Sequence, residues 1–457
     1  MNVIVIGGGV AGAASAIALR RLGVKVTVYE AYTEPAGQVG SFLSLASNGL
    51  RVLRSLGVLE QVQRAGIDMP GQRMWSSSGK LLGDVPRGRM SSDELHSVTL
   101  MRGALVEALR AEALAAGAVI VTSERLVDVV TIEEGVRAVF ANGLMAEASL
   151  LIGADGIWSA TRSLLDPDAP TPEYAGLYSI SGISDGIATE PGVFNLTFAR
   201  NGAFIHLAAP GGKVWWSAQI SCPAQPELSL TDEEWLRRLA ALYRHEQAPS
   251  AILEATTELH RPTLMHRLDA VPVRHNDRIA LLGDAGHPVG AGQGASMALE
   301  DALVLAQSLA TEPSAAAALS AYETARSARM AKMAKAASDN RDAKTAGPLT
   351  RRMRDLVMPV AVRLFYEKAT AWLYTHDCGE LPTSQPDGEF QVLQPRSAEK
   401  HTDAPTARPP LGLLLTSTQT AIKALGPQAT FRWGRRSRSQ PPSVEGEATR
   451  SRAGRGG

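Results

Sequence analysis

The sequence predicts an α/β protein in which a parallel sheet is interrupted by a β-rich unit and followed by C-terminal helices and a disordered tail. Strand and helix signals alternate to about residue 170 and resume at 278, which is typical of parallel strands joined by helices. Between these parts, from about 172 to 275, short strand-like runs dominate. We expect a sheet domain at 1–175 with a possible insertion near 70–97, a β-rich domain at 176–275, the rest of the sheet domain at 276–345, a helical segment at 346–381 and a tail at 382–457.

The N-terminus carries the most informative local pattern. The apolar run Val3–Ile6 predicts a buried strand, and it leads directly into G-x-G-x-x-G, formed by Gly7, Gly9 and Gly12. In such a turn the first glycine allows the tight bend, the second lets the backbone approach a pyrophosphate, and the third lets helix and strand pack closely. A second strand then delivers Glu30, whose carboxylate can accept hydrogen bonds from a ribose. The pattern predicts a dinucleotide site but does not separate FAD from NAD.

Two later strands end in small residues followed by an acid. Asp155 follows the expected strand 149–153, and Asp284 follows the expected strand 278–282. Ligands of open α/β sheets bind at the carboxyl ends of the strands, where both acids are expected. The glycine-rich stretch 290–294 then opens a long helix, whose N-terminus can face an anion. We therefore expect both segments to face the same ligand as the N-terminal turn.

These three segments, in this order and at this spacing, resemble the flavoprotein aromatic hydroxylases, which include the p-hydroxybenzoate and salicylate hydroxylases. The resemblance covers roughly residues 2–380. It implies a Rossmann-like FAD-binding domain of the glutathione-reductase type, with NADPH or NADH as co-substrate and O₂ as oxidant. It also implies that a C4a-hydroperoxyflavin hands one oxygen atom to a small aromatic, heteroaromatic or polyketide-like substrate.

The resemblance also assigns cofactor contacts to individual positions. The N-terminal turn and Glu30 would bind the ADP half of FAD, and Asp284 would bind the ribityl chain. Asp155 would lie near the pyrophosphate, with a part in NAD(P)H binding, and Arg102 matches an Arg-x-x-Leu helix start that contacts the flavin. The full set of expected cofactor-binding residues is Gly7, Gly9, Ala11, Gly12, Glu30, Arg102, Asp155, Asp284, Gly292 and Gly294.

The sequence identifies no catalytic residue with the same specificity. His206 lies on an expected strand and points away from its two neighbours, either into a cavity, where it would accept a phenol proton, or to solvent. Phe204 and Trp216 either line an aromatic pocket or belong to the core, and Pro288 is a further candidate beside the substrate. His287 fits a structural role in a tight turn better than a catalytic one. The cavity is expected between the FAD domain and the β-rich domain.

Composition and charge exclude several other classes of protein. The 46 basic residues balance the 46 acidic ones, so no nucleic-acid partner is expected. The nine histidines show no zinc-type spacing, which predicts no metal site. The chain enters a strand within two residues and contains no apolar run of about 18 residues, so neither a signal peptide nor a spanning helix is expected. A cytoplasmic monomer or homodimer is the simplest expectation.

Several alternatives stay open. The sequence departs from the family pattern at Gly286 and at 289–291, beside the expected flavin, so the resemblance implies the cofactor and does not specify the substrate. An epoxidase, a reductase of the geranylgeranyl type and a noncatalytic nucleotide-binding module share the same features. The tail contains an arginine run at 432–438 and two apolar stretches, 411–415 and 421–425, which either form a short docking helix or remain solvated.

Overall fold

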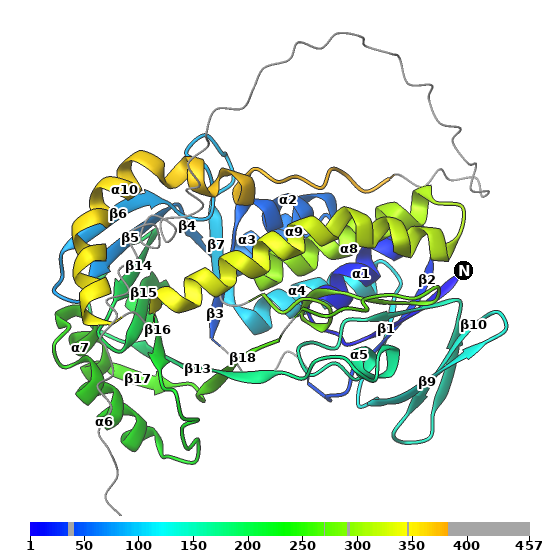
Figure 1. The fold of residues 1–457 in the computed structure, drawn as a ribbon, viewed down its shortest axis with the longest axis horizontal. Helices are drawn as coiled ribbons and strands as arrows, with labels where there is room; N and C mark the ends of the chain where they lie inside the picture. Colours follow the sequence, from blue (N-terminus) through cyan, green and yellow to red (C-terminus); the bar gives the residue numbers. More distant parts are fainter. Residues whose placement is uncertain (35–40, 269, 290–292, 345–346, 383–457) are drawn as a thin grey trace, which may run out of the picture.

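A computed structural model describes residues 1–34, 41–268, 270–289, 293–344 and 347–382 of the 457-residue chain (Figure 1). A parallel sheet lies at one end of the molecule and a larger, mixed sheet lies at the other, with two long helices running between them (Figure 1). These helices are α8 (Gly294–Thr311) and α9 (Ala315–Lys344).

The parallel sheet follows the pattern expected from the N-terminal half. Its strand order is β19-β12-β1-β2-β8, and every neighbouring pair is parallel. Helices α1, α4 and α8 pack on one face, and the small antiparallel sheet β9-β10-β11 packs on the other. The bounds are β1 Asn2–Ile6, α1 Val10–Arg21, β2 Lys25–Tyr29, α4 Arg102–Ala115, β8 Val119–Val121, β9 Leu126–Ile132, β10 Gly135–Phe140, β11 Met145–Ala148, β12 Leu150–Gly153, α5 Ala160–Leu165 and β19 Ile279–Leu281.

The larger sheet has the order β17-β13-β16-β15-β14-β5-β6, and β18 also pairs with β13. It combines strands from both the expected insertion and the β-rich region, because β14 pairs in parallel with β5. The domain boundaries given above stay predictions. The bounds are β5 Gly71–Ser76, β6 Leu81–Pro86, β13 Glu173–Ser184, β14 Val193–Phe198, β15 Gly202–Ala209, β16 Lys213–Ser221, α6 Asp232–Tyr243, α7 Gln247–Glu254, β17 Thr256–Leu259 and β18 Thr263–Arg267.

The two faces of the larger sheet have different neighbours. One face, here called the outer face, is covered by α6 and α7. The opposite face, the inner face, meets a three-stranded sheet in which β7 (Ser97–Met101) lies between β3 (Phe42–Leu45) and β4 (Ile67–Met69). Because β7 runs directly into α4, this small sheet connects the inner face to the parallel-sheet half. The short helices α2 (Ser47–Ser55) and α3 (Leu59–Ala65) lie between β3 and β4 in the chain.

The last helix, α10 (Pro348–Tyr374), lies along the outer edge of the molecule over β6 (Figure 1). Met358, Val362 and Tyr366 pack against the β5-β6 end of the sheet. Pro359 lies inside the helix and leaves the Asp355 carbonyl without its usual donor, and Lys80 Nζ donates to that carbonyl at 3.2 Å. In the part of the chain that the structure describes, no helix is long and apolar enough to cross a bilayer.

Candidate cofactor and active site

The three sequence signatures meet at one edge of the parallel sheet. Because β1, β12 and β19 are parallel neighbours, their carboxyl ends lie together. Gly7 lies against the end of β12, so close that a Cβ there would stand 2.4 Å from the Ala154 carbonyl oxygen. Gly283 lies against α1, where a Cβ would stand 3.1 Å from that of Ala11. The expected convergence of the three segments is therefore what the fold produces.

The glycine turn leaves open space where a pyrophosphate would lie. A Cβ at Gly12 would stand 1.9 Å from the Gly7 carbonyl oxygen, so this position is closed by the protein itself. A Cβ at Gly9, in contrast, would meet nothing within 4 Å. Gly9 is also the N-cap of α1, which has no side-chain cap, so its first N–H groups are available to an anion. These features fit the diphosphate of a dinucleotide.

Glu30 has a structural role that the sequence did not reveal. Its side chain is buried, and one carboxylate oxygen accepts a hydrogen bond from the Gly8 amide at 2.7 Å. The other oxygen accepts from the Tyr32 amide at 3.0 Å. Each carboxylate oxygen can accept a second hydrogen bond. Glu30 thus holds the glycine turn in shape and keeps acceptor capacity for a ribose hydroxyl.

Asp155 also proves to be engaged within the protein. Its carboxylate accepts hydrogen bonds from the Ser159 hydroxyl and from both the amide and the hydroxyl of Thr161. Burial raises the pKa of this carboxyl, and these donors act in the opposite direction. Asp155 therefore fixes the start of α5 at the edge of the sheet, and its expected part in NAD(P)H binding stays a prediction.

The side chain of Asp284 is accessible to solvent, but many protein atoms lie around its carboxyl group. It lies directly after β19 and remains accessible to solvent, yet burial by the nearby protein raises the pKa of its carboxyl. His287 and Arg102, the latter at the start of α4, act in the opposite direction on the pKa of this carboxyl, but burial dominates. A Cβ at Gly294 would stand 3.7 Å from Asp284 Oδ1, so the start of α8 closes on the same point. A hydroxyl-bearing chain, such as ribityl, fits these surroundings.

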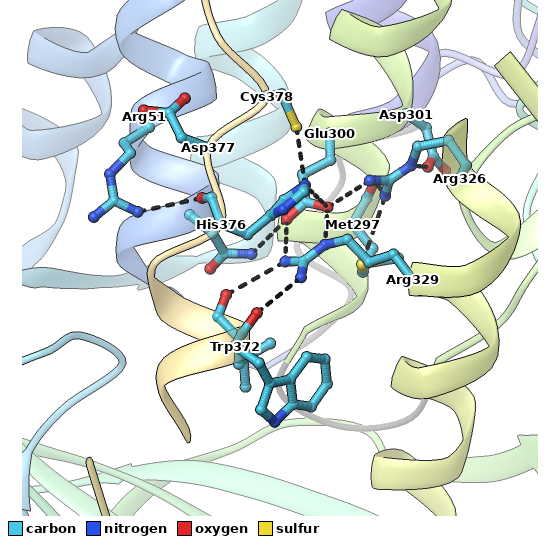
Figure 2. A network of polar contacts seen from close by, with 12 residues as sticks. Arg51, Met297, Glu300, Asp301, Arg326, Arg329, Trp372, His376, Asp377 and Cys378 are labelled. Atoms are coloured by element: carbon cyan, nitrogen blue, oxygen red, sulfur yellow. Dashed lines mark hydrogen bonds and ion pairs between the residues drawn. The ribbon is translucent and has the colours of Figure 1, made fainter. Parts of the chain in front are cut away.

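Asp301 and Glu300 of α8 form a buried ion network with Arg326 of α9 (Figure 2). Asp301 on α8 accepts hydrogen bonds from the Gly283 amide at 2.9 Å and from Arg326 Nε at 2.8 Å. His287 Nε2 lies 2.5 Å from the same carboxylate. Burial would raise the pKa of Asp301, but His287 and Arg326 outweigh it and lower the pKa to about 2. The structural role expected for His287 is confirmed, because it ties the turn after Asp284 to α8.

The neighbouring Glu300 extends the network to the C-terminus of α10 (Figure 2). Its carboxylate accepts hydrogen bonds from Arg326 and Arg329 of α9 at 2.6–2.7 Å and from the side-chain Nδ2 of Asn48 at 2.8 Å. Arg329 also donates to the carbonyls of Trp372 and Leu373, which lack intrahelical partners at the helix end. The end of α10 is thereby anchored to the parallel-sheet half.

Glu300 also belongs to the one group of potential metal ligands found among the described residues, with His376 and Cys378. The arrangement disfavours a cation. Arg326, Arg329 and Asn48 occupy the lone pairs of the Glu300 carboxylate, and the two guanidinium groups would repel a metal ion. Burial raises the pKa of the Cys378 thiol to about 12, so it stays protonated at neutral pH. We assign this cluster to structural support.

The network predicts how stability responds to acid. Because the folded-state pKa of Asp301 lies below its ordinary value of 3.8, its contribution is present above about pH 4 and is lost as the pH falls towards 2. The shift corresponds to about 2 kcal/mol of unfolding free energy. Urea unfolding at stepped pH should show this loss in the wild type and a smaller one in Asp301→Asn. Equal pH slopes for the two proteins would contradict the assignment.

The larger sheet requires a correction of the expected substrate-lining residues. Phe204 and Trp216 are fully buried on the outer face, where their rings stack and Tyr243 of α6 packs against Phe204. His206 pairs with Trp216 across β15 and β16 and so lies on this same face. Burial lowers the pKa of His206 to about 4, which keeps it neutral at pH 7. None of the three faces the parallel-sheet half, so they do not line a pocket between the two sheets.

The inner face carries the aromatic surface instead. Leu207 and Trp215 pair directly across β15 and β16, and both lie in one apolar cluster with Phe194. The Phe42 ring of β3 stacks on Trp215 with centroids 6.0 Å apart. The only sequence signal was the alternation along β15, which separates Ile205 and Leu207 from His206 without stating which side faces the cofactor.

Two further expected site residues are Pro288, beside the substrate, and Gly292, at the flavin. Pro288 is half-buried between His287, held by Asp301, and Val289, which packs on Met297 of α8. Its role beside the substrate stays a prediction. Gly292 lies outside the described residues, and its flavin contact stays a prediction.

Comparison with known proteins identifies the family. The model of the FAD binding domain family matches residues 1–337 of this chain. The chain belongs to the family of FAD-dependent aromatic hydroxylases. This monooxygenase is 30% identical, over 346 residues, to the aurachin C monooxygenase/isomerase of Stigmatella aurantiaca, covering 71% of this chain and 84% of that one. It is 28% identical to 3-hydroxybenzoate 6-hydroxylase 1 of Aquipseudomonas alcaligenes, with the same coverages.

The fold of the monooxygenase agrees with this assignment. A salicylate hydroxylase solved as a substrate complex superposes with a TM-score of 0.66 at 21% identity, covering 83% of this chain and 96% of that one. The expected fold class is confirmed by this superposition, and the FAD cofactor and the oxidoreductase class are confirmed by the family match.

Proposed function

We propose that the monooxygenase uses NAD(P)H and O₂ to hydroxylate a small aromatic, heteroaromatic or polyketide-like substrate that binds against the inner face. The observation that carries this proposal is the partly exposed aromatic surface of Phe42 and Trp215. This surface lies on the inner face of the larger sheet, which is turned towards the parallel-sheet half. Aromatic side chains of this kind stack on planar ligands. FAD supplies the redox chemistry when bound, and the protein positions the substrate and excludes water.

For the cofactor we propose the roles that the edge of the parallel sheet supports. Gly9 and the start of α1 would face the diphosphate, and Glu30 would accept from a ribose. Asp284 would hold the ribityl hydroxyls with Arg102 nearby. The support is the open space at Gly9 and the accessible carboxylate of Asp284.

Within this proposal, Arg87 favours an anionic aromatic substrate. Its guanidinium lies 3.5 Å from the centroid of the Phe194 ring, and it donates to the Gln72 side chain. The Nε atom is buried without a partner, and no carboxylate of the described residues pairs with it. Burial lowers the pKa of this guanidinium. Since a buried cation without a counter-ion is costly, a carboxylate or phenolate on the substrate would offset that cost.

The direct test measures NAD(P)H and O₂ consumption by the FAD-loaded enzyme over a panel of aromatic acids and their neutral amides. A hydroxylase consumes O₂ with NAD(P)H and releases a product with one added oxygen atom. An epoxidase also needs O₂ but adds oxygen across a double bond, whereas a reductase works without O₂. Turnover that is unchanged in the absence of O₂ would reject the proposal.

Arg87→Met tests the anion preference. The methionine keeps the packing on Phe194 and removes the charge, so KM for aromatic acids should rise by roughly 10- to 100-fold, the worth of a charged hydrogen bond. KM for the amides should change by less than about twofold. Arg73→Met is the matched control, because Arg73 lies on the outer face in ion pairs with Asp84 and Glu190. An equal rise for acids and amides would contradict a charge-specific role.

We also propose a cytoplasmic location and a monomeric or homodimeric state, the latter to be measured by size-exclusion chromatography with light scattering. The balanced charge of the chain supports the view that nucleic acid is not its partner.

A further inference from the structure

The outward side of α10 carries a continuous apolar stripe. Its members recur every three or four residues, which places them on one side of a helix. Each is between 40% and 75% exposed. The stripe consists of Leu349, Met353, Leu356, Val360 and Leu364. Single exposed apolar residues are ordinary, but a contiguous row of them marks an interaction surface.

Basic residues border the stripe. By helical periodicity, Arg352 and Arg363 lie along one side of it and Lys368 lies on the other, and all three side chains are exposed. No carboxylate of the described residues pairs with any of them. The two acids of the helix are engaged elsewhere, since Asp355 pairs with Arg354 and Glu367 accepts from the Ser91 amide. The exposed side of α10 is therefore apolar in the middle and positive at both margins.

We propose that this side of α10 docks the monooxygenase on the surface of an anionic lipid bilayer. An amphipathic helix with leucines on one side and arginine and lysine at its borders lies in the plane of a membrane, with the leucines in the acyl boundary and the cations at the headgroups. The stripe spans about 23 Å along the helix, and α10 lies at the outer edge of the molecule, so it can meet a flat surface (Figure 1).

Charge argues against the two other occupants of this surface. In a second copy of the chain, the positive borders of two α10 helices would face each other and repel. The C-terminal segment 383–457 contains apolar stretches at 411–415 and 421–425, but its Arg and Lys residues outnumber its Asp and Glu residues. Anionic lipid, in contrast, attracts both α10 and that basic segment.

The test uses the FAD-loaded full chain and sedimentation with vesicles. One set contains phosphatidylcholine alone, and the other contains phosphatidylcholine mixed three to one with phosphatidylglycerol. We expect binding to the anionic vesicles that falls with added salt, and little binding to the neutral ones. Leu356→Glu/Val360→Glu should weaken binding by roughly tenfold or more, and Arg352→Gln/Arg363→Gln should do the same at low salt. NAD(P)H oxidation should be unchanged in both variants.

The matched control is Val127→Glu/Val130→Glu, which changes two exposed apolar side chains on β9. It should bind vesicles like the wild type. Three results would overturn the proposal: no binding to anionic vesicles, undiminished binding by Leu356→Glu/Val360→Glu, or a solution dimer that this variant dissociates. The last result would assign the stripe to a second copy of the chain, and the second would assign membrane binding to the C-terminal segment.

Discussion

Gly9→Val should abolish FAD binding and leave the protein folded. A Cβ at Gly9 meets no protein atom within 4 Å, and the backbone there is extended, with φ −78°, so valine adds no internal strain. The added methyl groups would instead project into the space where the diphosphate approaches the turn. The flavin content of the purified protein, measured by absorbance after release, should fall below about a tenth of one FAD per chain.

Two glycines provide the controls for this result. Gly347→Val changes another N-cap glycine with extended backbone and open surroundings, at the start of α10, and should keep one FAD per chain. Gly12→Ala should lose both flavin and stability, because its Cβ would overlap the Gly7 carbonyl oxygen. Full flavin content in folded Gly9→Val would mean that the cofactor does not lie along this turn.

Arg326→Met should cost about 3–5 kcal/mol of unfolding free energy, the usual effect of removing one partner from a buried ion pair. Arg326 is fully buried and bonds both Asp301 at 2.8 Å and Glu300 at 2.7 Å. Glu300 keeps Arg329, but Asp301 would keep only His287 and the Gly283 amide. Because that amide precedes Asp284, FAD affinity should fall as well.

Urea unfolding of the apoprotein measures the first effect, and FAD titration measures the second. Arg64→Met is the control, since Arg64 and Glu60 form an exposed pair at 3.5 Å whose loss should change stability by less than about 0.5 kcal/mol. A similarly small change in Arg326→Met would show that the network contributes little to the fold.

The meeting of the three segments expected to bind the cofactor was predictable from the sequence, because the residue pattern of each segment is local. The strand, the glycines and the acid at each segment follow one another within a few residues, and adjacent parallel strands must bring their carboxyl ends to the same edge. The start of α6 is local in the same way, because Thr231 and Glu234 lie three residues apart and each accepts a hydrogen bond from the other's backbone amide. Glu30 and Asp155 follow the ends of β2 and β12, as the strand pattern predicts, and their contacts with the cofactor stay predictions. The amides and hydroxyls that donate to their carboxylates depend on the fold around them.

The sequence by itself determined the parallel sheet, the meeting of the three glycine- and acid-bearing segments at the carboxyl ends of its strands, and the class of chemistry, because these depend on residue order within short segments. Only the tertiary structure decided which side of β15 faces the parallel-sheet half of the molecule. Alternation along a strand defines two faces, but it does not say which neighbouring element covers each face. The tertiary structure also decided that Arg87 contacts the Phe194 ring and that Arg326 forms ion pairs with Glu300 and Asp301. Contacts between distant segments depend on packing, which a local pattern does not encode.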